Sequence, residues 1–441
     1  MTSTSDPAAR PIAIISAPGS RGDVNPMIAI GRALVALGFD CSISLAEPYA
    51  PLAEKAGLRP EVLISRERFD LLLADPSVWE PLSGLRHVLR GAASDFLRPH
   101  LDVIFKRKRP GRTVLVSHPL DFASRIHRDY DPQTPVADVV LSPAMVRDPK
   151  DPPVLTPWWF EPRRPSWLIS LGYRIGDLFI LDRYLGDAVN RTRRDLGLDP
   201  VQRIMHRWWL SPDTVLALYP DWFGASRPIG GGVWRQCGFP LAVNSAGMAA
   251  EDRQRLEEHR SSHEGVRGRS VFFTPGTAHR HAQAFFELGI AVCEELGRPA
   301  IFATSHQDQI PQGLPPWVLP IGYVPLDQVL PHCAALVHHG GIGTTAAGLA
   351  SGCPQVVTPM AFDQFHNASR LQQLGVGCTL YRPKLQALLA GLRGLIDQPR
   401  VDEKCRSLAN RLSREEDGAE VAARQIAGLL HRDACPARTE R

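Results

Sequence analysis

The chain contains the same strand–glycine loop–helix unit twice, and this repetition constrains its fold more than any other feature. Residues 11–18, "PIAIISAP", form an uninterrupted β-branched run, which is typical of a strand buried on both faces. The loop "GSRGDVNP" at 19–26 follows, then an apolar helix-like stretch at 27–38, with Pro26 expected in the first turn of that helix, and a second strand-like run at 39–48. This order predicts a βαβ unit, in which a helix connects two parallel strands.

The same order of elements starts again near residue 270. A strand-like run at 270–276 precedes a helical stretch at 278–297 and a further strand at 299–305. Three more strand-like runs follow, at 319–325, 334–341 and 354–360. Alternating strands and helices predict doubly wound parallel sheets. We therefore expect an α/β fold of two Rossmann-like domains that face a cleft.

The domain boundaries are expected where the composition changes. Residues 1–240 would form the first Rossmann-like domain and residues 269–415 the second. The polar and charged stretch at 241–268 is expected to connect them. Residues 416–441 would add a C-terminal helix and tail. An apolar stripe along that helix predicts that it packs back on the protein, across the two domains.

Composition excludes several classes of protein. Hydrophobic residues make up 44% of the 441 residues and charged residues 22%, as in a soluble globular protein. The net charge is only +4, and the basic residues are scattered along the chain, which argues against nucleic acid as a partner. The one dense basic run, at 105–112, is expected to be a solvated loop. No signal peptide or membrane-spanning run is evident, and the 8 cysteines show no metal spacing. We therefore expect a cytoplasmic protein.

The stretch "LVHHGGIGTTAAGLASG" at 336–352 is the strongest indication of a ligand site. Gly341 and Gly343 allow a ligand to approach the backbone closely. The first turn of the following helix leaves N–H groups unpaired, and the helix dipole favours negative charge there. With His339 and the hydroxyl of Thr344 beside them, these groups suit a phosphate or diphosphate.

The letters "GGIGTTA" also fit G-x-G-x-x-A, so a dinucleotide-binding oxidoreductase has to be considered. That motif belongs in the first strand–helix turn of a domain, whereas this copy follows several strands of the second domain. The P-loop pattern G-x-x-x-x-G-K-[ST] is absent from the sequence. An NAD(P)-dependent oxidoreductase and a non-catalytic nucleotide-binding module remain as alternatives.

Several segments resemble the GT-B, family 1 glycosyltransferases, which are inverting enzymes that use nucleotide sugars. Residues 338–368 resemble the donor-binding signature, residues 19–26 resemble the acceptor-side loop of bacterial members, and residues 322–331 resemble the segment that holds the nucleobase. The resemblance implies the GT-B fold, with the acceptor on the first domain and the donor on the second. Within the family, residues 75–81 and 203–223 are similar to the rhamnosyltransferase of rhamnolipid synthesis, its catalytic chain.

This resemblance implies transfer of L-rhamnose from dTDP-L-rhamnose to a hydroxyl of a lipid acceptor such as a hydroxyalkanoyloxy-alkanoate. A UDP-glucose-dependent enzyme acting on a sterol, polyketide or other apolar aglycone is the alternative within the family. The nucleotide sugar is a co-substrate and no cofactor is expected. Because no D-x-D motif is present where Mg²⁺ would need it, we expect no metal. Peripheral contact with the inner membrane, or with a partner acyltransferase, would bring such an enzyme to its acceptor.

The family pattern also assigns individual residues to the donor. Thr277 would contact a phosphate, together with the glycine turn described above. Tyr323 would stack on the nucleobase, and the backbone of Val324 would bind the edge of that base. Asp363 and Gln364 would hydrogen-bond hydroxyls of the donor sugar, because a carboxylate and an amide together can hold a vicinal diol.

Asp23 occupies the position of the general base, where plant relatives have a histidine. An aspartate carboxylate has an unperturbed pKa of about 3.9, so it is a weak base for an alcohol unless a closed cleft desolvates it. The alternative role for Asp23 is to N-cap the helix that follows. A Pro- and Trp-rich loop is expected to line the acceptor pocket with Trp158, Trp159 and Phe160.

Overall fold

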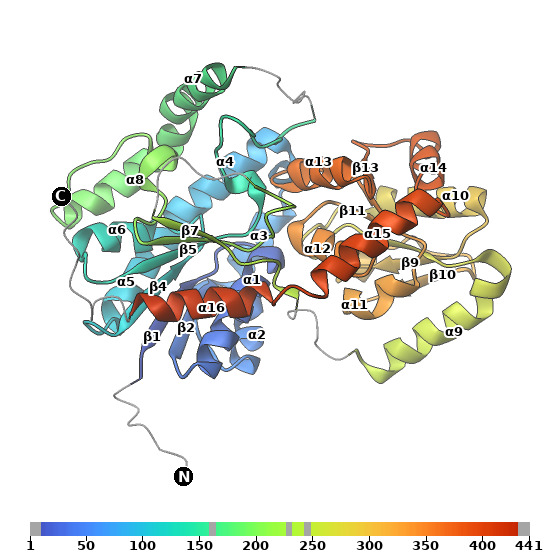
Figure 1. The fold of residues 1–441 in the computed structure, drawn as a ribbon, viewed down its shortest axis with the longest axis horizontal. Coiled ribbons are helices and arrows are strands. Elements are labelled where there is room, and N and C mark those ends of the chain that lie inside the picture. The colour runs from blue at the N-terminus through green and yellow to red at the C-terminus, as the bar shows by residue number, and fades with distance from the viewer. Residues whose placement is uncertain (1–9, 158–164, 226–231, 242–247, 431–441) are drawn as a thin grey trace, which may run out of the picture.

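The computed structural model describes residues 10–157, 165–225, 232–241 and 248–430, which fold into two α/β halves lying side by side (Figure 1). The first half contains a parallel sheet with the strand order β3-β2-β1-β4-β5-β6-β7. Its strands are β1 (Ile12–Ser16), β2 (Asp40–Ala46), β3 (Arg59–Ile64), β4 (Thr113–Ser117), β5 (Val136–Val140), β6 (Thr214–Ala217) and β7 (Val233–Gln236).

The second half contains a parallel sheet with the strand order β10-β9-β8-β11-β12-β13. Its strands are β8 (Val271–Thr274), β9 (Ala300–Ala303), β10 (Val318–Ile321), β11 (Ala335–His338), β12 (Gln355–Val357) and β13 (Gly377–Thr379). In each sheet the chain order reverses beside the first strand, as in a doubly wound fold. The prediction of an α/β protein with two Rossmann-like domains is confirmed.

Helices surround both sheets (Figure 1). They are α1 (Arg21–Ala36), α2 (Ala50–Lys55), α3 (Arg66–Ala74), α4 (Pro81–Gly91), α5 (Leu97–Arg107), α6 (Phe122–Tyr130), α7 (Ser166–Gly176), α8 (Asp182–Asp195), α9 (Ala250–Arg267), α10 (Gln283–Leu296), α11 (Leu326–Val329), α12 (Ile342–Ala350), α13 (Gln364–Leu374), α14 (Leu385–Arg393), α15 (Pro399–Leu412) and α16 (Gly418–Leu429). Within the described residues, no helix is both long and apolar enough to cross a membrane.

Helix α1 begins earlier than its proline suggested. Its N-cap is Ser20, and Asp23 closes a capping box by accepting the backbone N–H of Ser20 at 2.9 Å. Pro26 therefore lies inside the helix, and the expectation that it stands in the first turn is wrong. Asp23 is the third helical residue and not the N-cap, because Ser20 already fills that position.

The last helix joins the core of the first half. α16 packs along α1, and Ala422 and Ile426 are fully buried among the residues of the first sheet's core (Figure 1). Within 241–268, the stretch expected to connect the domains, the structure contains α9. That helix contacts β10 and places Leu256 against the apolar core of the second half.

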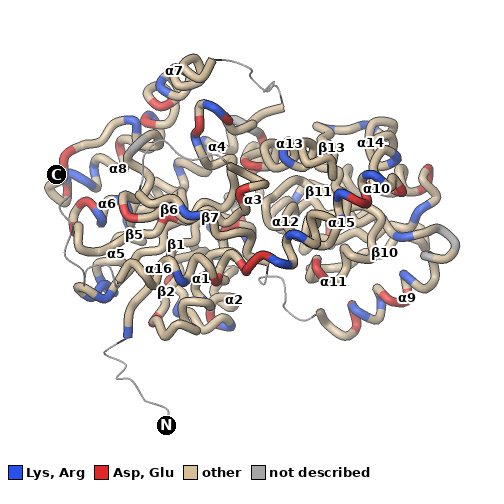
Figure 2. The backbone as a smooth tube through the Cα atoms, in the orientation of Figure 1, with Lys and Arg blue, Asp and Glu red and all other residues tan. Residues whose placement is uncertain are grey.

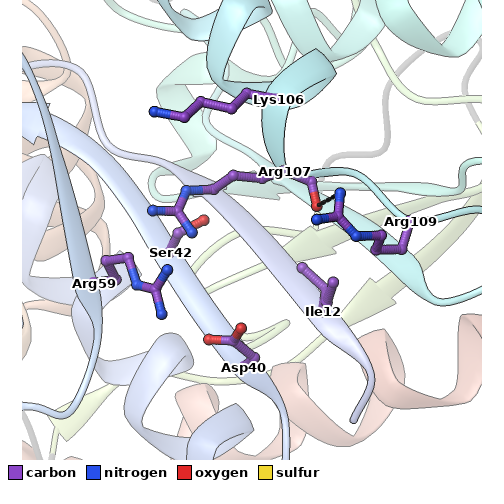
Figure 3. Close-up of a pocket in the computed structure, with 7 residues that line it drawn as sticks. All are labelled: Ile12, Asp40, Ser42, Arg59, Lys106, Arg107 and Arg109. Atoms are coloured by element: carbon purple, nitrogen blue, oxygen red, sulfur yellow. Dashed lines mark hydrogen bonds between the residues drawn. The ribbon is translucent and has the colours of Figure 1, made fainter. Parts of the chain in front are cut away.

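The basic run at 105–112 is only partly the solvated loop that we expected. Its first three residues complete the last turn of α5, and the rest is loop. Together with Arg59, the side chains of Lys106, Arg107 and Arg109 line a hollow of about 400 Å³ at the amino ends of β1, β2 and β3 (Figure 3). Elsewhere, basic and acidic residues are interspersed over both halves (Figure 2).

Candidate active site

The segments that carry most of the predicted site residues follow the carboxyl ends of central strands. Asp23 follows β1, Thr277 follows β8, His339 follows β11 and Asp363 follows β12. In open parallel sheets, ligands bind at this edge, where the chain order reverses. The hollow of Figure 3 lies at the opposite edge of the first sheet.

His339 is held between two glycines. A Cβ placed on Gly276 would lie 2.7 Å from Cε1 of His339, and a Cβ on Gly341 would lie 2.5 Å from Nε2. Neither position can therefore carry a side chain while the imidazole stays in place. Burial, and then the nearby His279, lowers the pKa of His339 to about 4, so at neutral pH the ring donates a single N–H.

The N-terminus of α12 is open to a ligand. Gly341 is its N-cap, no side chain caps the helix, and Gly343 is exposed while Thr344 is half-buried. The neighbouring His338 has a different place, because it is fully buried in β11 and its Nδ1 accepts the backbone N–H of Gly340 at 3.2 Å. Of the two adjacent histidines, only His339 lies beside the open helix turn.

A hydrogen-bonded chain ties Asp363 to the first half of the molecule. The side-chain amide of Asn367 donates to Oδ2 of Asp363 at 2.8 Å and to the carbonyl of Gly340 at 2.9 Å. Its Oδ1 accepts from the hydroxyl of Ser142 at 2.9 Å. Burial raises the pKa of Asp363 to about 6, and the charge of Asp23 raises it as well. The two carboxylates therefore lie within electrostatic reach of each other across the domains.

Sequence analysis did not identify Asn367 or Ser142. The spacing of Asp363 and Asn367, four residues apart on a helix, could have suggested that pair.

Gln364 differs from expectation in one respect. Its Oε1 accepts the backbone N–H groups of Met360 and Ala361 at 2.8 and 3.1 Å, so its carbonyl oxygen holds the loop and only the amide N–H side is left for a ligand.

Tyr323 lies between β10 and α11, at the edge of the second half. Its side chain is 39% exposed, and the guanidinium of Arg21 covers one face of the ring at 3.7 Å from the centroid. Val324 beside it is buried. A nucleobase stacking on Tyr323 would use the other face or would displace Arg21, whose stacking on an aromatic ring is a weak interaction at exposed sites.

Two groups flank the carboxylate of Asp23. Its Oδ2 accepts from both the backbone N–H and the hydroxyl of Ser20, at 2.9 and 3.2 Å. Its Oδ1 lies 3.4 Å from Nε2 of His118, a fully buried histidine at the end of β4. Sequence analysis missed His118, although a polar residue directly after a strand adjacent to β1 is the signal that could have identified it.

An aromatic wall connects the two halves. Trp79, at the end of a short 3₁₀ turn (Pro76–Trp79), contacts the ring of His279 with 5.1 Å between centroids and that of Phe362 with 6.3 Å. Phe362 directly precedes Asp363 and has φ +59°, an uncommon conformation for a bulky residue. The ion pair Arg280–Asp70, at 2.5 Å, closes the same interface. None of these contacts was predicted.

The structure says less about the contacts of the remaining predicted site residues. Thr277 is half-buried in the loop between Gly276 and His279. Trp158, Trp159 and Phe160, predicted for the acceptor pocket, lie outside the described residues. Among the residues that are described, no group of three or more His, Cys, Asp or Glu side chains could hold a metal ion.

Comparison with known proteins places this geometry in context. Residues 299–427 match a family model described as "Erythromycin biosynthesis protein CIII-like, C-terminal domain". Among curated proteins, the chain is similar to O-mycaminosyltylonolide 6-deoxyallosyltransferase of Streptomyces fradiae. The two are 27% identical over 431 residues, which cover 90% of this chain and 92% of the relative.

Solved glycosyltransferase structures have the same fold over nearly the whole chain. The glycosyltransferase of kitacinnamycin superposes with a TM-score of 0.69 at 21% identity, over 96% of this chain and 99% of that one. The spinosyn rhamnosyltransferase SpnG, solved with thymidine diphosphate, superposes with a TM-score of 0.63 at 17% identity, over 95% of this chain and 100% of that one. The fold is GT-B.

Proposed function

We propose that this chain, a glycosyltransferase of the GT-B fold, moves a 6-deoxyhexose from a dTDP-linked donor to a hydroxyl of an apolar acceptor, with inversion at the anomeric carbon. The observation that carries the proposal is the approach of Asp23 and Asp363 from opposite halves, close enough for the charge of one to raise the pKa of the other. A base on the acceptor side then faces a sugar-binding carboxylate on the donor side.

The leaving diphosphate would sit at the glycine turn. The open N-terminus of α12 offers backbone N–H groups, and the half-buried His339 offers one more donor beside them. Hydrogen bonds from such fixed donors strengthen as negative charge develops on the diphosphate in the transition state. The half-buried Thr277 and the hydroxyl of Thr344 would add further contacts.

The aromatic wall supports a 6-deoxyhexose over a hexose. Phe362 is adjacent to Asp363, and Trp79 and His279 extend the wall from there towards His339. A sugar held between Asp363 and a diphosphate bound at the glycine turn would place part of its ring against these apolar surfaces. The names of the relatives, a 6-deoxyallosyltransferase and a rhamnosyltransferase, point to the same class. L-Rhamnose is therefore the first donor sugar to test.

For the acceptor, an apolar polyketide aglycone is the class favoured by the macrolide named in the first relative. A lipid such as a hydroxyalkanoyloxy-alkanoate is the second candidate, and contact with the inner membrane or with an acyltransferase would accompany it. One observation favours it: α7 projects from the first half and exposes Trp167, which is 66% exposed (Figure 1). Phe179, just after α7, is 71% exposed. A transfer assay with polyketide aglycones and with vesicle-borne lipid separates the two acceptors.

We expect the chain to prefer dTDP-L-rhamnose over dTDP-L-mannose, which differs from it only by a hydroxyl at C6, by about tenfold or more in kcat/KM, because one added hydroxyl against an apolar wall costs roughly 1–3 kcal/mol. Trp79→Leu should reduce this preference by opening the wall, whereas Trp222→Leu should not. Trp222 contacts Phe223 and Phe239 in a separate aromatic cluster. Equal use of both sugars by the unaltered protein, or an unchanged ratio in Trp79→Leu, would contradict the assignment of the wall.

Asp363→Asn should have opposite effects on activity and stability. The amide accepts sugar hydroxyls less strongly than a carboxylate, so transfer should fall by about tenfold. The folded pKa of Asp363, about 6, lies above its unfolded value of 3.8, so the native carboxyl loses stability as pH rises from about 4 to about 6. The variant avoids this loss, and its melting temperature should gain more at pH 7.5 than at pH 4. An equal gain at both pH values would contradict the raised pKa of Asp363.

A further inference from the structure

We propose that His118 is a positioning residue for the general base, with its Nε2–H holding Oδ1 of Asp23 so that a lone pair faces the acceptor hydroxyl. The inference rests on the proposed function, in which Asp23 takes the proton of the acceptor. β4 pairs with β1 in the sheet, so the residues that follow the two strands meet at one edge. His118 thus reaches Asp23 from inside the protein, and its side chain is fully buried.

The hydrogen bonds around His118 determine which ring nitrogen carries the proton. The backbone N–H of Leu120 donates to Nδ1 at 3.2 Å, so Nδ1 has a lone pair and the proton of the neutral ring is on Nε2. Nε2 is buried and makes no hydrogen bond of ordinary geometry within the described residues. Oδ1 of Asp23, 3.4 Å away, is the acceptor at hand. Catalytic hydrogen bonds are often long before substrate binds, and they shorten in the complex.

The backbone of His118 is fixed as well. Its N–H donates to the hydroxyl of Ser16 at 2.9 Å, in the last position of β1. The imidazole therefore has little freedom to turn away, and an N–H left buried without a partner would cost free energy. Strand β1, which leads to the start of α1 and Asp23, thus also holds the backbone of His118 in place.

The two oxygens of Asp23 have separate tasks in this arrangement. Oδ2 is occupied by the two hydrogen bonds from Ser20, which fix the carboxylate on α1. Oδ1 accepts from His118 and keeps one lone pair for the acceptor. The acceptor oxygen bonds to the anomeric carbon, the bond from that carbon to the diphosphate oxygen breaks with its electron pair leaving on the nucleoside diphosphate, and the acceptor's proton goes to Oδ1. His118 keeps its proton throughout.

Two substitutions separate this role from simple packing. His118→Met fills the space without a donor, whereas His118→Gln supplies an amide N–H that can reach Oδ1. We expect kcat to fall about tenfold in the Met variant and to recover in large part in the Gln variant, because hydrogen bonds to charged groups are the strong ones. Donor affinity should stay unchanged in both, since His118 lies on the acceptor side.

The pH profile gives a readout that packing alone would not move. Without the Nε2–H the carboxylate form of Asp23 loses a stabilising donor, so the acid limb of kcat should move to higher pH in His118→Met and not in His118→Gln. Arg21, Tyr49 and Asp363, the other charged or titratable groups around Asp23, stay in place. His127→Met is the matched control. It removes a buried histidine of α6 that contacts Phe105, and it should leave the acid limb in place.

Equal kcat in the Met and Gln variants, or an acid limb that does not move, would overturn the inference. Nitrogen-15 NMR tests the inference independently of any transferase activity. The His118 ring should be protonated on Nε2, and its Nε2–H resonance should shift in Asp23→Asn. A proton on Nδ1, or no shift, would also overturn it. If the unaltered protein transfers no sugar, the proposed function fails, while the NMR result still decides whether His118 binds Asp23.

Discussion

Asp23→Asn should lower kcat by about 10²–10⁴-fold, the range that general-base catalysis contributes, and should leave the affinity for the nucleotide sugar nearly unchanged. The amide has the size of the carboxyl group, and its oxygen can still accept the backbone N–H of Ser20, which Oδ2 now accepts at 2.9 Å. Helix α1 therefore begins as before, whereas the basic lone pair and the acceptor for the Nε2–H of His118 are lost. Single-turnover kinetics and calorimetric titration with the donor measure the two quantities separately.

Asp417→Asn is the matched control for that substitution. Asp417 N-caps α16 and accepts the backbone N–H of Ala419 at 2.9 Å, so the same chemical change is made at the start of another helix. A surface cap of this kind changes stability by about 1 kcal/mol at most and should leave kcat alone.

The sugar in the product should have inverted anomeric configuration, because one base and one in-line attack give a single displacement. Retention of configuration, or near-normal kcat in Asp23→Asn, would leave Asp23 as a capping residue only.

His339→Ala is expected to have the second-largest effect. The imidazole is neutral, because burial lowers its pKa to about 4, so it contributes one N–H hydrogen bond to a charged phosphate rather than an ion pair. Such a bond is worth about 1.5–3 kcal/mol, which corresponds to a loss of roughly 10- to 150-fold in affinity for the nucleoside diphosphate. The same loss should appear in kcat/KM, because the diphosphate is bound in the transition state as well. Isothermal titration with dTDP and steady-state kinetics measure both.

His332→Ala provides the comparison. His332 is exposed and lies just before the amino end of β11, whereas His339 follows the carboxyl end of the same strand. Removing it should change neither affinity nor rate. If His339→Ala keeps dTDP affinity and kcat/KM within about twofold of the unaltered protein, the glycine turn does not bind the diphosphate. A drop in melting temperature without loss of affinity would assign His339 to the packing between Gly276 and Gly341.

The sequence alone determined the two Rossmann-like sheets. The central strands that it predicted, such as β1 and β8, are short β-branched or aromatic runs, so local patterns carry the information, and the prediction of the fold class was confirmed. The open turn at Gly341 was also identifiable, because glycines before a helix leave backbone N–H groups without side-chain caps. The predicted start of α1 was wrong, because the capping box of Ser20 and Asp23 begins the helix and Pro26 lies inside it. The roles of Asp23, Tyr323 and Asp363 stay predictions.

Only the tertiary structure decided what surrounds those residues. His118 meets Asp23 because β4 pairs with β1, two strands that lie far apart in the sequence. Trp79 meets Phe362, and Arg21 covers Tyr323, only because the two halves lie against each other. Periodicity encodes contacts between neighbours along the chain, whereas these contacts depend on how two separately folded sheets are placed. The sequence by itself therefore indicates the central strands and the loops that follow them, and the orientation of side chains from one half towards the other follows only from packing.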